Sequence, residues 1–469
     1  MVYIFIPIYI SINLLIGFWA SKRVKNTSDF TLAGKNLSSA FVGVTLFATW
    51  FGSSQIMGNP SYFVMDGFSA FMTLCVAGGL CFAIVGLFYA RKLYRLNLVT
   101  VGDFFKRRFS KQMDVTISIL LIFSYPPWIA AQLVALSFLF ESIFGMPVNF
   151  GIVLAAVIVM FYTYIGGMWA VSYTDMVQSV LILAGMIYLF YTLMQETGGM
   201  APVFESKPDS FFSLFPKNTI NGWSDYLAVF LAYSVGAIPA QEIYQRIFSA
   251  KSSRAAISGL YLGSFLLIFI STIPMLIAIT AAYLHPELMD INGGQNIIPM
   301  TVSAFSSVPV QILFFGALIS AILSTSSGAM LAPATIVGEN LIKTNFPQIT
   351  DRRLLLFTRL SVVLIAAISC GFAFINSDIV QLVVISLSLI MVCVFAPFTF
   401  GIFWQKSSIF GAWAAIILGA AIFLGCLLAE TTIDPTIYGL IGSCVAMYVG
   451  SLIKPDPEIH PIYSEMKKR

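Results

Sequence analysis

Long apolar segments follow one another along almost the whole chain, and this pattern limits the fold more than any other feature. A helix needs about 20 mostly apolar residues to cross the hydrocarbon core of a bilayer. By this rule the chain has about thirteen candidate spans, at residues 2–20, 38–60, 67–94, 113–144, 149–165, 168–195, 223–248, 253–284, 308–341, 352–376, 378–403, 408–429 and 436–453. Charged residues make up only 10% of the 469 residues, too few to cover a soluble protein of that size. We therefore predict an all-α, polytopic membrane protein embedded in a lipid bilayer.

The basic residues predict how the chain is oriented. If the loop after the first span is cytoplasmic, every Lys and Arg falls on the cytoplasmic side except Lys207 and Lys217. Loops rich in Lys and Arg stay in the cytoplasm. We therefore expect a multi-pass protein of the inner (plasma) membrane, with its N-terminus outside and its C-terminus in the cytoplasm. The C-terminal stretch KPDPEIHPIYSEMKKR is polar and contains three prolines, so we predict that it is disordered.

Two of the spans carry residues that interrupt a helix. Residues 38–60 contain Gly52, Ser53 and Pro60, and residues 223–248 contain Gly236 and Pro239. Gly and Pro weaken a helix, and Ser competes for its backbone hydrogen bonds. These spans are the second and the seventh, five apart, as expected for two five-helix halves that form an inverted repeat. Broken helices at matching places predict a secondary transporter whose ligands bind at the breaks.

Hydroxyl groups cluster in the ninth span, in the stretch ALISAILSTSSGAML. Ala321, Ser324 and Thr325 are spaced i, i+3 and i+4 and share one helix face. Hard cations prefer oxygen ligands, so two hydroxyls together with carbonyls freed by the break in the second span would suit sodium. The alternative is that these hydroxyls bond back to their own helix or pack against a neighbour. The broken second span favours sodium.

Four stretches of the sequence resemble the solute:sodium symporters. They are ATWFGSSQIMGNPSYF (48–63), YTYIGGMWAVSYTDMVQ (162–178), IPAQEIYQRIFSAKS (238–252) and AILSTSSGAML (321–331). Details such as TWFG and the IP-x-Q-x-x-x-QR element are most similar to the choline-transporter branch. The resemblance covers nearly the whole chain.

The resemblance implies a LeuT-like five-plus-five inverted repeat with one extra N-terminal helix and two C-terminal helices. The divisions expected from it are an N-terminal helix with its loop at 1–37, a first repeat at 38–222, a second repeat at 223–406 and a C-terminal pair with the tail at 407–469. It also implies a common sodium (Na+) site made by the carbonyls of Ala48, Phe51 and Ala321 and the hydroxyls of Ser324 and Thr325.

A second sodium site is implied at Asp175, Ser324 and Ser327. It is put in doubt because Gly328 stands where such members can have serine. Asp175 can equally be interpreted as a helix cap or loop-pairing residue near the cytoplasmic end of its span.

Polar and aromatic residues near the two breaks are the candidates for solute binding. They are Trp50, Ser53, Gln55, Trp128, Gln132, Gln241 and Glu242. Aromatic faces hold ammonium groups, and a carboxylate in the membrane is a functional candidate because its burial is costly. These residues predict a cationic or zwitterionic solute such as choline, a betaine or an amino acid.

The predicted function is therefore sodium-coupled symport of a small organic solute by alternating access. Two alternatives remain on the same fold: proton-coupled symport of a sugar, sialic acid or monocarboxylate, and a membrane sensor that does not transport. The sequence has no phosphate-binding G-x-x-x-x-G-K-[ST] loop and no pattern of catalytic residues. We therefore expect neither an enzyme nor a nucleic-acid partner, and an oligomeric state compatible with a monomer.

Overall fold

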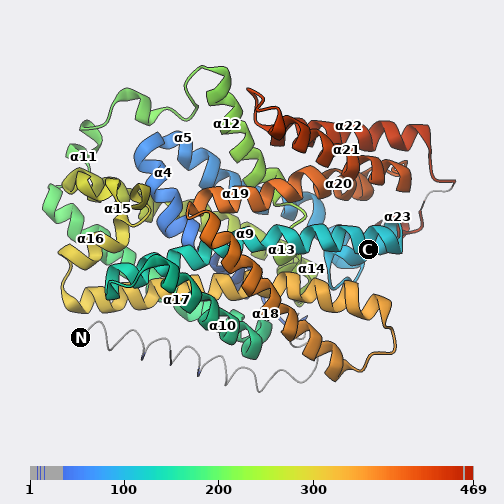
Figure 1. Ribbon diagram of the computed structural model, residues 1–469, viewed down its shortest axis with the longest axis horizontal. Coiled ribbons are helices and arrows are strands. Elements are labelled where there is room, and N and C mark those ends of the chain that lie inside the picture. Colours follow the sequence, from blue (N-terminus) through green and yellow to red (C-terminus); the bar gives the residue numbers. More distant parts are fainter. Residues whose placement is uncertain (1–7, 9–10, 12–14, 16–34, 458–459, 468–469) are drawn as a thin grey trace.

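The computed structural model describes residues 8, 11, 15, 35–457 and 460–467, except for the side chains of residues 165–179, 181 and 467. In this part of the chain helices follow one another with short connections (Figure 1). The helices of the first half are α3 (Ser39–Trp50), α4 (Asn59–Asp66), α5 (Phe68–Ala70), α6 (Ala77–Ile84), α7 (Ala90–Arg95), α8 (Val101–Arg108), α9 (Lys111–Phe144), α10 (Val148–Thr197) and α11 (Ala201–Glu205). Those of the second half are α12 (Ile220–Leu231), α13 (Gln241–Ser249), α14 (Ser253–Ile270), α15 (Thr272–Leu284), α16 (Ile297–Phe305), α17 (Val308–Ile336), α18 (Asp351–Ile375), α19 (Ile379–Ile390), α20 (Ala396–Phe403), α21 (Ile409–Leu428), α22 (Pro435–Ile453) and α23 (Ile462–Lys467).

Ten of the predicted spans are present as membrane-length helical units. Nine helical units in the described residues are long and apolar enough to cross a bilayer, and a tenth is the bent pair Ser39–Trp50 and Ser54–Asp66. The predicted fifth and sixth spans both fall in α10, which has 50 residues and is assigned as one helix. The boundary predicted between them lies where the side chains are not described. The first predicted span lies almost wholly outside the described residues.

The two predicted interruptions are both present. The second span bends by 62° between Trp50 and Ser54. The seventh span passes from α12 through a π-helical turn at Ala232–Gly236 and a non-helical stretch before α13 begins at Gln241. Pro60 does not make the first break, because it lies in the first turn of α4, where a missing N–H leaves no hydrogen bond unmade.

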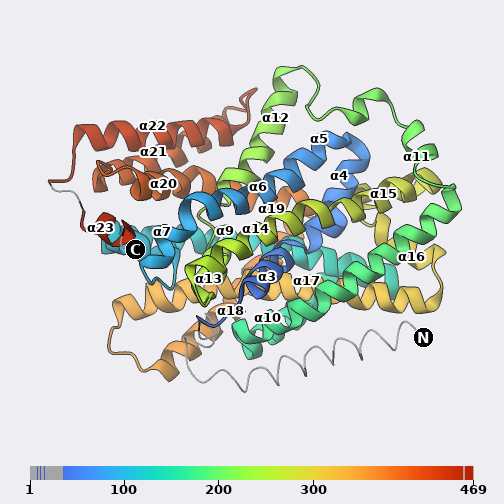
Figure 2. The ribbon, with the colours of Figure 1, turned by 180° about the vertical axis from the view of Figure 1, so that it is seen from behind.

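The helices run between two ends of the molecule, which are seen at the right and left of Figure 1. We call the end that carries α8 and α23 the inner face and the end that carries α11 and α16 the outer face; the sequence predicts that the inner face is cytoplasmic. At the inner face Leu37 accepts a backbone hydrogen bond from Lys251 at 2.9 Å and donates one to Ser249 at 3.0 Å. This pairing ties the start of α3 to the end of α13. Seen from behind, α3 lies between α13 and α17 at the centre of the bundle (Figure 2).

The prediction that the tail is disordered is wrong for the described part of it. Residues 462–467 form α23, and Ile462, Tyr463 and Met466 are buried against the inner face. The polar residues that suggested disorder have partners there: Arg107 forms an ion pair with Glu465. The composition of the tail was a poor guide because the tail docks on other parts of the chain, including Arg95, Arg107 and Arg108, which lie more than 300 positions away in the sequence.

Candidate functional site

The break in the second span exposes backbone groups in the middle of the bundle. Phe51 leaves the helical conformation, with φ −86° and ψ 59°, so the α3 hydrogen-bond ladder stops there. The backbone N–H of Ser53 donates to Oε1 of Gln132 on α9, at 3.0 Å. A side chain from another helix therefore replaces the lost backbone acceptor, which a buried N–H requires.

Two of the predicted sodium ligands, Ala48 of α3 and Thr325 of α17, meet at this break. The hydroxyl of Thr325 donates to the carbonyl oxygen of Ala48 at 2.9 Å, across 277 positions of sequence. Ser324 is the neighbouring residue, Ala321 lies one turn away on the same face of α17, and all of them are buried. The two oxygens that meet here are neutral, a ligand type that suits a monovalent hard cation. The complete set of five ligands, including the Phe51 carbonyl, stays a prediction.

Gly52 keeps the two helices close at this point. A Cβ on Gly52 would lie 2.7 Å from the Thr325 hydroxyl oxygen and 2.7 Å from Gln132 Oε1. Real Cβ atoms do not approach other atoms so closely, so any larger residue would have to push Thr325 or Gln132 away.

We expect Gly52→Ala to impair transport severely. Overpacking costs about 1–3 kcal/mol. If Thr325 is the residue that shifts, the sodium concentration for half-maximal uptake should rise roughly tenfold to hundredfold. Gly371→Ala in α18 is the matched control, since a Cβ there meets nothing within 4 Å. Equal uptake by both variants at limiting sodium would show that the close approach at Gly52 is not needed.

The other hydroxyls of α17 have different surroundings. Ser326 donates back to the carbonyl of Ile322 at 2.5 Å, as a hydroxyl packed against its own helix does. The Ser327 hydroxyl has no hydrogen-bond partner within the described residues. Asp175, its predicted partner in a second sodium site, lies in the segment whose side chains are not described. That second site stays a prediction.

A small cavity lies beside the break. Its volume is about 20 Å³, enough for roughly one water molecule, so the pocket is too narrow for an organic solute in this conformation. It is lined by Trp50, Ser54, Gln55, Trp128, Tyr233, Glu242, Val383 and Leu387. The predicted residues Trp50, Gln55, Trp128 and Glu242 are brought together here.

Glu242 provides the carboxylate of this pocket. It is 2% exposed and lies in the first turn of α13, where the helix dipole favours a negative charge. One carboxylate oxygen accepts a short hydrogen bond from the Tyr125 hydroxyl. Among the described residues no Lys or Arg forms an ion pair with it. The guanidinium of Arg246, one turn along, instead donates to the Thr49 hydroxyl at 2.8 Å.

Three predicted solute-binding residues do not line the pocket. Gln132 and Ser53 bond to each other, as described above. Gln241 accepts from the Val101 N–H at 2.8 Å and reaches the Val99 carbonyl at 3.4 Å, so it ties α13 to the loop before α8. Gln132 thus satisfies a backbone group at the first interruption and Gln241 satisfies backbone groups at the start of α8, and neither lines the cavity.

Sequence reasoning missed four lining residues. Tyr233 lies in the π-helical turn before the second break, and its hydroxyl has no hydrogen-bond partner within the described part of the chain. An aromatic residue so close to a predicted interruption was a usable signal. Val383 and Leu387 on α19 carried none, because they are ordinary apolar residues of an apolar span. The sequence analysis named Ser53 as a solute-binding candidate and did not name its neighbour Ser54.

A larger cavity of about 760 Å³ opens at the outer face. Its lining includes residues of the outer loop, such as Lys217, together with Tyr62 and Val380. Val380 lies one turn before Val383 on α19, so the wide cavity leads toward the narrow pocket along this helix. In the lining of the wide cavity the Tyr62 hydroxyl donates to Asp378, the N-cap residue of α19, at 3.1 Å. The conformation is therefore wide on the outer side and narrow at the pocket.

Two broken helices that meet around a central narrow pocket, inside an all-helical bundle, define the class of LeuT-like secondary transporters. A solved Na+-coupled sialic acid symporter, in a substrate-bound outward-open state, has this fold with a TM-score of 0.81. The match covers 97% of this chain and 99% of that chain at 18% identity.

The chain belongs to the sodium:solute symporter family, whose family model matches residues 30–419. It is similar to the osmoregulated proline transporter OpuE of Bacillus subtilis, at 27% identity over 98% of this chain and 97% of the relative. It is also similar to the human high affinity choline transporter 1, at 24% identity over 88% of this chain and 74% of the relative. The predicted family and the all-helical, LeuT-like fold class are confirmed, while the count of thirteen spans stays a prediction.

Proposed function

We propose that the chain imports a small organic cation or zwitterion together with sodium, and that a compact cation is the preferred solute. The observation that supports this most is the Glu242 carboxylate, which is buried in the pocket without an ion-pair partner among the described residues. A buried charge is costly unless it is paired. An ammonium group in the pocket would supply the missing positive charge, and the faces of Trp50 and Trp128 would hold its methylene or methyl groups.

The relatives agree with this preference in part. One is a choline transporter and another is a proline transporter. Choline is a cation, and proline is a zwitterion. A zwitterion also needs a partner for its carboxylate, and the pocket lining contains no Lys or Arg. This difference favours choline or another amine over proline or a betaine.

Sodium would act through the contact between α3 and α17. A cation held by the Ala48 carbonyl and the Thr325 hydroxyl links the two helices next to the pocket, so it favours the conformation in which they are close. A ligand shifts a conformational equilibrium only by its different affinity for the two states. When α17 moves away from α3, the oxygens separate and sodium is released. With the predicted orientation, release occurs on the cytoplasmic side.

The test is uptake by purified protein in liposomes under separate sodium and proton gradients. The panel contains choline, a betaine, proline, a sialic acid and a neutral sugar. We expect sodium-driven uptake of the cation, weaker uptake of the zwitterions and none of the sugar. Uptake driven by protons without sodium, or a preference for an anionic solute, would refute the proposal. Sodium binding without any uptake would favour the sensor alternative.

A further inference from the structure

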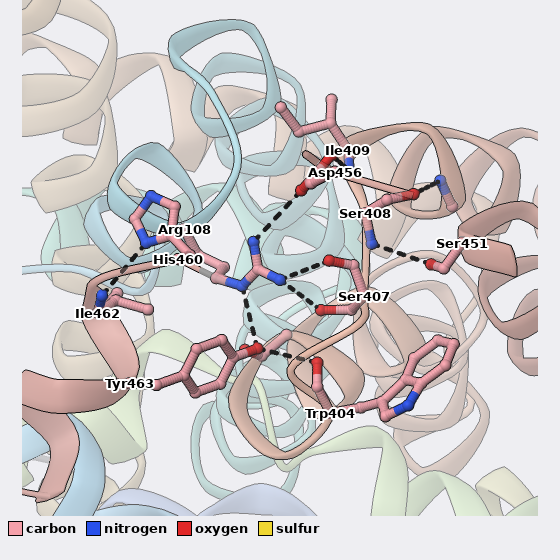
Figure 3. Close-up of polar contacts among 12 residues, drawn as sticks. Arg108, Trp404, Ser407, Ser408, Ile409, Ser451, Asp456, His460, Ile462 and Tyr463 are labelled. Carbon is pink, nitrogen blue, oxygen red and sulfur yellow. Dashed lines mark hydrogen bonds and ion pairs between the residues drawn. The ribbon is translucent and has the colours of Figure 1, made fainter. Parts of the chain in front are cut away.

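The tail of the chain is fastened to the inner face by a buried arginine. Arg108, at the end of α8, is 2% exposed, and its guanidinium points between the tail and the loop that joins α20 to α21 (Figure 3). Its Nε donates to the Tyr463 hydroxyl at 3.1 Å, and one terminal nitrogen donates to Ser407 Oγ at 2.8 Å. The other terminal nitrogen lies 3.7 Å from the Asp456 carboxylate.

Tyr463 also closes the end of a membrane span. Its hydroxyl lies 2.8 Å from the Gly401 carbonyl and 2.9 Å from the Trp404 carbonyl, at the end of α20. Carbonyls in the last turn of a helix have no partner within the helix. Asp456 satisfies a backbone group at the start of α21, where its carboxylate accepts a hydrogen bond from the Ile409 N–H at 3.2 Å. The tail therefore caps both sides of the α20–α21 loop.

The same tail contacts the third span. Arg95, at the end of α7, donates to the Met466 carbonyl at 2.8 Å, and α23 packs against α7. The tail thus bridges the inner ends of two spans, the third through α7 and the eleventh through α20, which are separated in sequence by about 300 residues. The two spans also meet directly: the Tyr89 hydroxyl shares a hydrogen bond with Thr399 at 3.0 Å, and the Lys92 ammonium lies 3.8 Å from the centroid of the Phe403 ring. The tail therefore adds a second connection between them.

We propose that the described residues of the tail, 455–457 and 460–467, form a clamp that holds the inner face closed, with Arg108 and Tyr463 as its positioning residues. Alternating access requires the inner ends of the spans around the site to move relative to one another. The clamp is docked in a conformation whose wide cavity opens at the outer face. Because it adds to the contacts that hold two of those spans together, its release favours the inward-open state, and its strength sets how often that state is reached.

The charges around the clamp agree with a docked state at neutral pH. Burial and the nearby Arg108 lower the pKa of His460, so this side chain is neutral there and adds no positive charge beside the guanidinium. Asp456 and Glu465 provide negative charge close to Arg108 and Arg107. The docked tail therefore balances a basic part of the inner face.

The clamp is tested by thiol accessibility of the full-length purified protein, which needs no solute. Thr335→Cys places a thiol on α17 at a position that is 0% exposed and faces Gln245 of α13, away from the tail. We expect Tyr463→Phe to speed its labelling by a water-soluble reagent about threefold to tenfold, as loss of one or two hydrogen bonds would. Ending the chain after Lys454 should have at least as large an effect.

Tyr448→Phe is the matched control, because Tyr448 is half exposed and stacks on Trp404 outside the clamp. The protein without Thr335→Cys gives the background of the six native cysteines. A purely structural role of Tyr463 would lower the yield of folded protein on size exclusion and leave the labelling rate of the folded fraction at the control value. That result, or an unchanged rate in the truncated chain, would overturn the clamp and leave the proposed solute untouched.

Discussion

Thr325→Ala is expected to abolish sodium coupling at physiological sodium concentrations. The substitution removes the hydroxyl that reaches the Ala48 carbonyl at 2.9 Å and leaves the helix α17 intact. Hydrogen bonds and contacts to a charged ligand contribute about 1.5–3 kcal/mol, so the sodium concentration for half-maximal uptake should rise roughly tenfold to hundredfold. Uptake measured against external sodium, at fixed solute, gives this value directly.

Two neighbouring substitutions make the result specific. Thr325→Ser keeps the hydroxyl and should retain most of the sodium affinity. Ser326→Ala removes a hydroxyl one residue away that bonds only to Ile322 of its own helix, so we expect a change of less than about twofold. If Thr325→Ala and Ser326→Ala behave alike, α17 does not bind sodium through Thr325.

The places where the chain leaves regular helix could be predicted from the sequence because their causes are local. Gly52 and Ser53 weaken the second span, and Gly236 and Pro239 weaken the seventh, whatever surrounds them. Both interruptions are present. The exact residues of each break depend on packing, since the first break lies at Phe51, before the Gly and Pro that follow it.

The roles of the polar residues beside the breaks could not be predicted in the same way. Gln132, Gln241 and Glu242 all read as polar groups in apolar spans, and each one therefore suggested solute binding. Only the three-dimensional arrangement shows which backbone groups need a partner. Two glutamines are used for that purpose, and the glutamate is left facing the cavity.

The order of the tail could not be predicted from the sequence either. Its composition indicates disorder when the tail is considered alone, because it has too few apolar residues to form a core. Three of them, Ile462, Tyr463 and Met466, suffice when a preformed inner face accepts them. The arginine that anchors the tail is in α8, and a basic residue beside a membrane span gives no sign that it is buried.

Glu242→Gln is expected to have the largest effect on the solute. The change keeps the shape of the side chain and its capacity to accept from Tyr125, but removes the negative charge. A desolvated charge pair in a binding site is worth several kcal/mol, so we expect binding of an organic cation to weaken by a hundredfold or more. A neutral sugar should still not be taken up. Glu196→Gln, an exposed carboxylate at the end of α10, is the control for charge alone.

In Glu242→Gln the stability of the protein should stay equal or rise while cation binding weakens. This combination distinguishes a carboxylate that binds solute from one that stabilises the fold. Glu242 lacks an ion-pair partner among the described residues, so removing its charge relieves a desolvation cost, and the melting temperature without solute should stay equal or rise. A carboxylate that held α9 and α13 together through Tyr125 would instead give a lower melting temperature in Glu242→Gln and a similar loss in Tyr125→Phe. Weakened cation binding in a protein of undiminished stability therefore identifies Glu242 as the group that binds the cation, while retained cation binding would remove the main support for a cationic solute.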